Sequence, residues 1–336
     1  MIAIWLFACC AMIFAMIVIG GVTRLSQAGL AIVQWQPLLG IIPPLSQAEW
    51  QELFRQYQQF PEFQILNYGM VIDEFKTIYW IEYLHRLGGR LIGIVFLVPF
   101  LYFLAKGWLK RRLSLHFTLI FILGGLQGLL GWYMVKSGLD KDPIVSPYRL
   151  TAHLLGAFTI YAYALWLALG LLMPKPDAAM GAMVARIRRL NWWVVAMVML
   201  TVSSGAFVAG LDAGLTYNTF PLMDGQLIPE GLFAFEPFQV NFFENVTTVQ
   251  FDHRWLAIAT AILILYLWWR ARTVALTDHA RLLAHGLAAM ALIQPALGIA
   301  TLVLVIPTPL AATHQAGAIV LFTFALALAH ALRARY

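Results

Sequence analysis

Eight apolar runs, each close to the length of a membrane-spanning helix, dominate the sequence. A helix needs roughly 20 apolar residues to cross a hydrocarbon core of about 30 Å. Composition agrees, because 61% of the residues are hydrophobic and only 11% are charged, whereas about a quarter of a typical soluble domain is charged. We therefore expect an all-α integral membrane protein with eight transmembrane helices, near residues 2–22, 82–104, 115–135, 150–172, 191–210, 253–269, 283–305 and 313–332.

The distribution of charge predicts the orientation of these helices. Basic residues gather after the second, fourth and sixth runs and at the carboxyl end, as Lys106, Lys110, Arg111, Arg112, Lys175, Arg186, Arg188, Arg189, Arg270, Arg272, Arg281, Arg333 and Arg335. Only two acids, Asp177 and Asp278, share that side. By the positive-inside rule this side is cytoplasmic, and with eight crossings both termini lie there. The net charge of +6 therefore reflects topology, and no basic block with interleaved aromatics predicts nucleic-acid binding.

The first apolar run predicts a retained helix. It begins MIAIWLF, with neither a basic leader nor a small-residue cleavage site, and no Arg/Ser-rich transit sequence precedes it. We therefore expect a bacterial inner membrane protein. Cys9 and Cys10 are adjacent within this run. Neighbouring cysteines argue against a thiolate metal site and against an unstrained disulfide.

Two outer loops are long enough to carry function. In residues 23–81, Ser46 with Glu49 three residues later predicts a capped helix start. Trp50, Leu53, Phe54 and Tyr57 then recur at helical spacing, so we expect an amphipathic helix on the membrane surface or over a cavity. The other long loop, 211–252, holds six acids and no Lys or Arg.

The two halves of the chain repeat. GGVTRLSQAGL at 20–30 is similar to GAFVAGLDAGL at 205–215, LHR at 84–86 to DHR at 252–254, LQGLLG at 126–131 to IQPALG at 293–298, and AHLLGA at 152–157 to THQAGA at 313–318. Because each half has an even number of crossings, both point the same way. The sequence therefore predicts two tandem pseudo-symmetric four-helix bundles, in domains 1–180 and 181–336.

Four of the eight histidines take equivalent places in the repeat. His85 and His253 open the second and sixth helices, and His153 and His314 open the fourth and eighth, all toward the outer, periplasmic side. A lone membrane histidine is more often a hydrogen-bonded packing residue, but two repeated pairs favour ligation. Since no carboxylate or thiolate completes a zinc or copper shell, heme fits better than a bare metal. The others read as interface or solvated residues near the cytoplasmic helix ends, namely His116, His279, His285 and His330.

The two histidine pairs differ in one neighbouring side chain. Glu82 stands three residues before His85, whereas Gln250 occupies the matching place before His253. A carboxylate at only one pocket suggests proton-coupled chemistry there and a cofactor in the other pocket. The alternative is that Glu82 merely favours the amino end of a helix dipole. Four arginines near the outer surface are candidates to pair with heme propionates, two of them directly after a histidine: Arg86, Arg254, Arg24 and Arg149.

Several long motifs resemble the heme A synthase family, in its proteobacterial and mitochondrial branch. They are VQWQPLLGIIPPLS at 33–46, DEFKTIYWIEYLHRLGGRLIG at 73–93, TYNTFPLMDGQLIPEG at 216–231, FFENVTTVQFDHR at 242–254 and ATHQAGA at 312–318. The resemblance runs through nearly the whole chain. It implies an oxidoreductase that converts the C8 methyl of heme O to the formyl group of heme A by successive hydroxylations, with oxygen from water, for cytochrome oxidase.

The resemblance also implies roles for individual residues. His85 and His153 match the ligands of the substrate heme, heme O or heme A, and Glu82 matches a functionally important glutamate of the family. His253 and His314 match the ligands of a heme b cofactor. Part of the family carries a cysteine pair in the outer loops, and this chain has no cysteine there, which places it in the branch without that pair.

The competing function is a di-heme b-type membrane cytochrome that passes electrons between quinol and a partner, since histidine pairs alone do not separate the two. A repeat-built transporter is weakened, because no helix pair is interrupted by matched Gly and Pro at mid-membrane. Candidate partners of the enzyme are membrane lipid, heme O synthase, an electron acceptor such as a ferredoxin-type protein, and a second copy of the chain.

Overall fold

The computed structural model describes residues 1–35, 39–139, 144–173 and 181–333. Within these residues the chain is helical, with no strand and a single isolated bridge between Met223 and Gln226. Eight helices of the described chain are long and apolar enough to cross a membrane: α1 (Ile2–Leu25), α3 (Ile72–Ala105), α4 (Arg111–Gly138), α5 (Pro147–Leu172), α6 (Ala182–Gly210), α8 (Val246–Ala271), α9 (Asp278–Val303) and α10 (Thr308–Ala331). The prediction of an all-α protein with eight transmembrane helices is confirmed.

Shorter elements lie in the two long connections. The first holds α2 (Gln47–Tyr57), a 3-10 turn (Leu39–Ile41) and a π-helical turn (Glu62–Leu66). The second holds α7 (Asn241–Glu244) and two 3-10 turns (Ala213–Leu215 and Phe238–Val240). Three residues used for the topology prediction, and the predicted boundary at 180, lie outside the described residues: Lys175, Asp177 and Arg335.

The chain divides into two compact units. One is Cys9–Ile160, and the other is Met1–Ala8 together with Tyr161–Tyr336. The division falls inside α1 and α5, so the second part of α5 belongs with the C-terminal helices. The predicted domains 1–180 and 181–336, each a four-helix bundle, stay a prediction.

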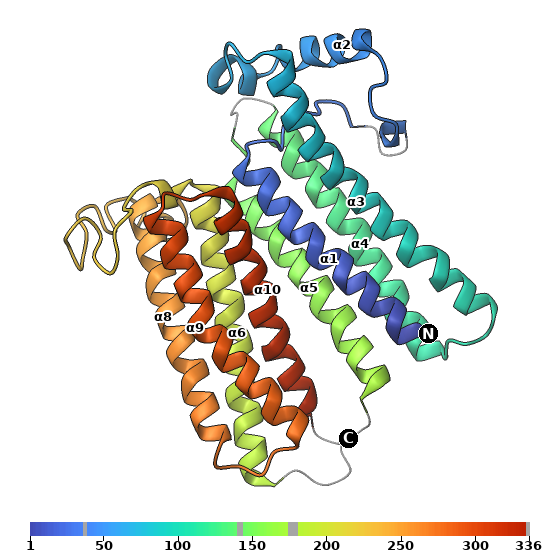
Figure 1. Cartoon of the computed structure of the whole chain (residues 1–336), viewed down its shortest axis with the longest axis vertical. Coiled ribbons are helices and arrows are strands. Elements are labelled where there is room, and N and C mark those ends of the chain that lie inside the picture. Colours follow the sequence, from blue (N-terminus) through green and yellow to red (C-terminus); the bar gives the residue numbers. More distant parts are fainter. Residues whose placement is uncertain (36–38, 140–143, 174–180, 334–336) are drawn as a thin grey trace. The chain divides into compact units, whose positions relative to one another are not determined.

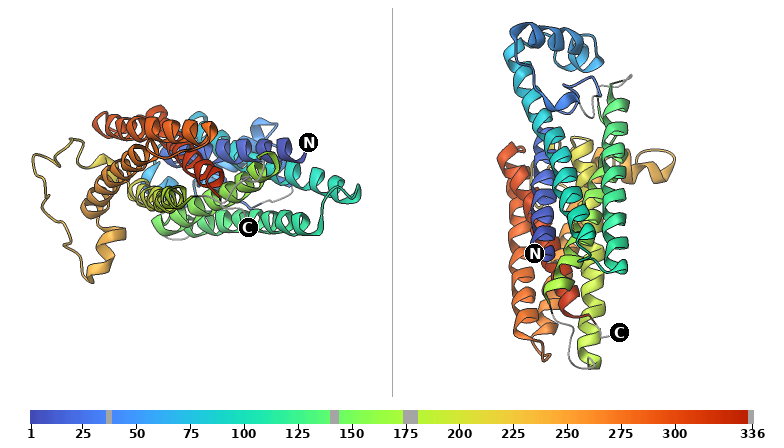
Figure 2. Two further views of the ribbon diagram at one scale, coloured as in Figure 1. Left: turned by 90° about the horizontal axis from the view of Figure 1, so that it is seen from below. Right: turned by 90° about the vertical axis from the view of Figure 1, so that its right-hand side faces the viewer.

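Four helices of the C-terminal unit pack as a closed group. Helix α6 contacts α8 and α10, and α9 contacts the same two helices, as the views in Figures 1 and 2 agree. Alanines along α9 and α10 are buried there, and such small side chains let membrane helices approach closely. Asn191 of α6 donates to the carbonyl of Ala325 on α10 at 2.9 Å, and the hydroxyls of Thr201 and Thr260 join α6 to α8 at 2.8 Å.

Helix α3 of the N-terminal unit is longer than the sequence predicts. It begins at Ile72 rather than near 82, because its first turns carry polar residues such as Asp73 and Glu74 that interrupt the apolar run without ending the helix. His85 therefore lies about four turns inside the helix and does not open it. The expected start of the second helix was wrong, and the site lies correspondingly deeper along α3.

The amphipathic helix of the first loop forms as predicted but packs differently. Ser46 accepts from the backbone N–H of Glu49 at 3.3 Å, and the Glu49 carboxylate accepts from the N–H of Ser46 at 3.4 Å, which completes the capping box. Its apolar face lies on the first turns of α3, where the Trp50 and Tyr79 rings are 4.9 Å apart and Phe75 is buried. Figure 1 shows α2 at that end of α3. This face therefore covers protein, and α2 builds a small outer core with α3.

Candidate functional site

The four repeated histidines lie on four different helices. His85 is on α3 and His153 on α5, while His253 is on α8 and His314 on α10. Within the N-terminal unit, His85 and His153 are close enough to interact electrostatically, and His253 and His314 are likewise close within the C-terminal unit. The structure therefore brings together the two pairs that the repeat predicts.

Each histidine ring packs against a glycine of a neighbouring helix, which we call its seating glycine. A Cβ atom built on Gly20 of α1 would lie 3.0 Å from Cε1 of His85, and one on Gly131 of α4 would lie 2.9 Å from Cε1 of His153. Contacts this short are rarely tolerated, so a side chain at either glycine would displace the ring. The glycines thus fix the depth at which each ring sits in its unit.

The C-terminal unit repeats the same seating. The distance from a Cβ built on Gly205 of α6 to Cε1 of His253 would be 2.9 Å, and that from Gly298 of α9 to Cε1 of His314 would be 2.8 Å. Gly205 stands where Gly20 stands in the repeat, and Gly298 where Gly131 stands. All four rings therefore occupy one built position, reproduced in both halves.

A glutamine holds one histidine of each pair. Gln127 Nε2 lies 3.2 Å from Nδ1 of His153 and donates to the His153 carbonyl at 2.7 Å. Gln294 makes the same two contacts with His314, at 3.1 and 2.7 Å. Each glutamine therefore positions its histidine through the histidine carbonyl, and its amide N–H₂ group, which only donates, is not an acceptor for an Nδ1 proton.

The other histidine of each pair, His85 or His253, differs between the two halves in the hydrogen bonding of its Nδ1 atom. Ser204 lies 2.9 Å from Nδ1 of His253 and donates to the carbonyl of Thr201 at 2.8 Å. In the N-terminal half, Nδ1 of His85 is buried and has no hydrogen-bond partner. Ile19, a residue without a donor, occupies the place before Gly20 that Ser204 occupies before Gly205.

The donor set fits heme. Among the described residues, no group of three or more His, Cys, Asp and Glu side chains could hold a metal ion. Two imidazoles alone leave a bare zinc or copper ion short of ligands, whereas a porphyrin supplies four nitrogens and needs only axial ones. The glycines that pack against all four rings, and the Ser204 oxygen as an acceptor for Nδ1 of His253, fit such ligands.

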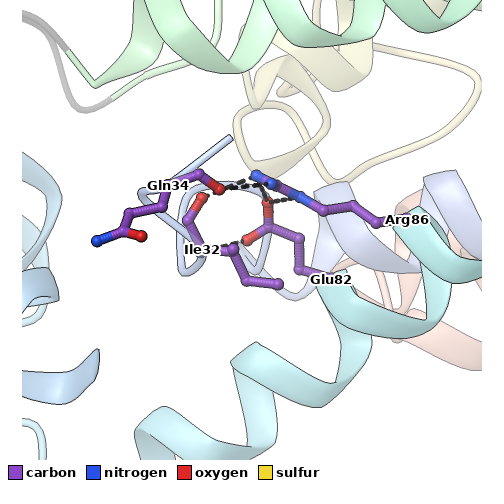
Figure 3. A network of polar contacts seen from close by, with 4 residues as sticks. All are labelled: Ile32, Gln34, Glu82 and Arg86. Atoms are coloured by element: carbon purple, nitrogen blue, oxygen red, sulfur yellow. Dashed lines mark hydrogen bonds and ion pairs between the residues drawn. The ribbon is translucent and has the colours of Figure 1, made fainter. Parts of the chain in front are cut away.

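Glu82 is part of a clamp on the loop that follows α1. Its carboxylate is 3% exposed and accepts from the backbone N–H of Ile32 at 2.8 Å and from Arg86 Nη2 at 2.6 Å. Arg86 Nη2 also donates to the Ile32 carbonyl at 2.8 Å, and its Nη1 to the Gln34 carbonyl at 3.3 Å (Figure 3). Since Glu82 lies about three turns inside α3, the alternative of a charge at a helix start is wrong.

The same clamp recurs in the C-terminal half with a neutral partner. Arg254 donates from Nη2 to Gln250 Oε1 at 2.9 Å and to the Tyr217 carbonyl at 2.7 Å, and from Nη1 to the Thr219 carbonyl at 2.8 Å. In the repeat, Tyr217 corresponds to Ile32 and Thr219 to Gln34, whose carbonyls accept from Arg86 in the first half. Both arginines thus use some of their N–H groups to hold loop carbonyls. Their pairing with propionates, and that of Arg24 and Arg149, stays a prediction.

A buried carboxyl outside the membrane-spanning helices completes the outer core. The Tyr57 hydroxyl donates to Glu62 Oε2 at 3.0 Å and accepts from Asn67 Nδ2 at 2.7 Å. Burial, with a smaller contribution from the charge of Glu82, raises the pKa of Glu62 to about 7 in spite of the hydrogen bond from Tyr57, which lowers it. The outer core therefore carries a group that titrates near neutral pH.

Among the histidines predicted to be interface or solvated residues, His330 is fully buried. Its ring lies 4.9 Å from that of Trp166 in an edge-on arrangement, and Arg333 Nη1 is 2.8 Å from its Nδ1. His285 accepts from Trp268 Nε1 at 2.9 Å. Both contacts are with nearby protein groups, as an interface role predicts, but solvation is wrong for His330.

Sequence reasoning missed the residues that orient the histidines. Gln127, Gln294 and Ser204 were not predicted, and neither were the four seating glycines. A signal was present, because the glutamines and glycines recur within the aligned segments LQGLLG and IQPALG. Their function depends on which helix faces which, and the alignment by itself does not contain that.

The eight apolar helices define a multi-pass membrane protein. The chain belongs to the COX15-CtaA family of cytochrome oxidase assembly proteins, whose family model matches residues 3–326. It is 55% identical over 332 residues to a protein of Nitrosospira multiformis named heme A synthase, covering 99% of this chain and 93% of that protein. It is 47% identical over 335 residues to heme A synthase COX15 of Homo sapiens, covering 98% of this chain and 82% of that protein.

Proposed function

We propose that this protein is a heme A synthase, an oxidoreductase that makes heme A for cytochrome oxidase from heme O. The observation that carries the proposal is the 55% identity to a heme A synthase across 99% of the chain. The repeated histidine pairs support it, since the enzyme needs a place for its substrate. In the proposed reaction the C8 methyl group and one water give a formyl group, four protons and four electrons, through successive hydroxylations.

We assign the N-terminal pair, His85 and His153, to the substrate heme, and the C-terminal pair, His253 and His314, to heme b. Heme b, when bound, supplies one-electron transfer between the substrate and an acceptor outside the chain. The seating glycines support this assignment, because they pack against all four rings in the same way, and Ser204 supports it as an acceptor for Nδ1 of His253.

Glu82 is the proposed catalytic group of the N-terminal site. Its two oxygens are engaged with Arg86 and with the Ile32 N–H, and an ion-paired carboxylate is a poor proton acceptor. The contacts therefore favour electrostatic stabilisation of positive charge on the oxidised substrate over proton abstraction. The matching Gln250 carries no charge, as a site that only holds a cofactor allows.

The orientation in the membrane is proposed from charge and aromatic residues. The ends of α3 and α8 farther from the histidines bear Lys106 stacked on Tyr102 at 5.8 Å and Arg272 stacked on Trp268 at 5.1 Å. Aromatic residues anchor helices at either interface, and an excess of basic residues marks the cytoplasmic one. We therefore place both termini in the cytoplasm and the histidine pairs toward the periplasmic side of a bacterial inner membrane.

Extraction of the hemes tests the function. The protein is expressed with heme O synthase, purified, and its hemes are separated by chromatography. Heme A or hydroxylated heme O supports the proposal, whereas heme b alone, at two per chain, supports the di-heme cytochrome. His253→Ala should remove heme b, and His330→Ala is the matched control, because His330 also lies on a transmembrane helix of the C-terminal unit but contacts Trp166 and Arg333.

A further inference from the structure

The four histidines differ in one respect that bears on how firmly each would hold an iron. Nδ1 has a polar neighbour in three of them, supplied by Gln127, Gln294 and Ser204. In His85 the same atom is buried without a partner. The difference falls within an otherwise faithful repeat, since His85 has the same glycine seat as the others.

The cause of the difference is a single position. Ser204 reaches His253 from the turn before Gly205, with its hydroxyl tied to the Thr201 carbonyl. Ile19 occupies the equivalent turn of α1 and is only partly buried. The Ile19 side chain has no hydrogen-bond donor or acceptor, so the Nδ1 atom of His85 has no hydrogen-bond partner.

An acceptor for the Nδ1 proton strengthens a histidine ligand. It fixes the tautomer, holds the ring plane and raises the basicity of Nε2, and loss of such an acceptor costs about 10–100-fold in metal affinity. Ser204 is such an acceptor for His253, because its own hydroxyl proton goes to the Thr201 carbonyl. The two glutamines place a donor beside Nδ1 and position their histidines through the histidine carbonyls. His85 has no acceptor on Nδ1, so it is the weaker ligand of the repeat-equivalent pair His85 and His253.

We propose that His85 is the exchangeable heme ligand of the N-terminal site, and that Ile19 keeps it exchangeable by withholding an acceptor from Nδ1. The inference rests on the proposed function, in which the N-terminal site must take in heme O and let heme A leave at every turnover. The repeat counterpart His253 has an acceptor in Ser204, so the C-terminal site would retain its heme. Gln127 would keep His153 in place through its bond to the His153 carbonyl while His85 exchanges.

The experiment gives His85 the partner it lacks. Ile19→Ser places a hydroxyl where Ser204 stands in the other half, with Ile19→Ala as the control that removes the same bulk without a hydroxyl. Purified protein carrying heme O and heme b is mixed with excess apomyoglobin, and the captured hemes are identified by chromatography over time. This readout measures release and requires no turnover.

In the unmodified protein, heme O or heme A should leave faster than heme b. Ile19→Ser should slow the loss of the N-terminal heme by about tenfold or more, and Ile19→Ala should leave it unchanged. Equal slowing by both variants would assign the effect to packing and overturn the proposal. No slowing by Ile19→Ser in folded, heme-loaded protein would overturn it as well.

A second variant covers the case in which Ile19→Ser does not fold. Ser204→Ala should speed the loss of heme b by about tenfold or more. Ser204→Thr, which keeps the hydroxyl, should restore the slow loss of the unmodified protein. Unchanged heme b loss in Ser204→Ala contradicts the inference. Failure of the proposed function would be seen differently. Heme O would then be bound and lost to apomyoglobin at the expected rates but never converted to heme A.

Discussion

The two arginine clamps predict unequal costs for the same substitution. Arg86→Gln removes a cation from a carboxylate that is 3% exposed, and an unpaired buried charge costs about 3–5 kcal/mol. Arg254→Gln removes hydrogen bonds to the neutral Gln250 and to backbone carbonyls, which costs about 1–3 kcal/mol. Arg86→Gln should therefore destabilise its unit by roughly 2 kcal/mol more than Arg254→Gln destabilises the other.

Amide hydrogen exchange measures this locally. The Ile32 N–H donates to Glu82, so its protection should fall sharply in Arg86→Gln. The double variant Glu82→Gln with Arg86→Gln removes the charge as well as its partner. It should recover part of the loss, because the penalty comes from the unpaired anion. Equal losses in the two arginine variants, or strict additivity in the double variant, would refute the ion-pair account.

Three further outcomes are expected. Because the pKa of Glu62 is about 7 in the fold and lower when unfolded, the outer core should be most stable below about pH 4.5. That contribution, about 3 kcal/mol, should fade as the pH rises through 7 and vanish in Glu62→Gln, as thermal unfolding from pH 5 to 8 would show. Gly298→Ala, whose Cβ would lie 2.8 Å from His314, should lose heme absorbance, whereas Gly128→Ala, with nothing within 4 Å, should not. Ser46→Ala should weaken α2 by about 1 kcal/mol, seen as faster exchange of its first amides and no change in heme content.

The sequence predicted those features that depend on the length of an apolar run, on the internal repeat or on residues close together in the chain. Each apolar run is long enough to span a bilayer, so the eight helices could be counted without knowing their neighbours. The repeat placed His85, His153, His253 and His314 in two pairs, since duplicated segments fold alike. The capping box at Ser46 needs only residues three apart, and it formed as predicted.

Other features required the assembled helices. The first turns of α3 read as a polar loop in sequence, but α2 covers Phe75 and Tyr79 and makes them helical core. The sequence predicted a carboxylate at one pocket, but the Ile32 N–H that donates to Glu82 lies 50 residues earlier in the chain. Such contacts depend on which side chains meet across helices, and hydropathy carries no record of that.

By itself the sequence determined the number of membrane crossings, the twofold repeat and the histidines that it duplicates, because apolar length and periodic similarity are local properties of the chain. Tertiary structure alone decided what surrounds each ring: a seating glycine for all four, a polar neighbour at Nδ1 for three, and none for His85. The physical reason is that hydrogen-bond satisfaction inside a membrane protein is settled between helices, where a buried polar atom finds a partner only if the facing residue supplies one.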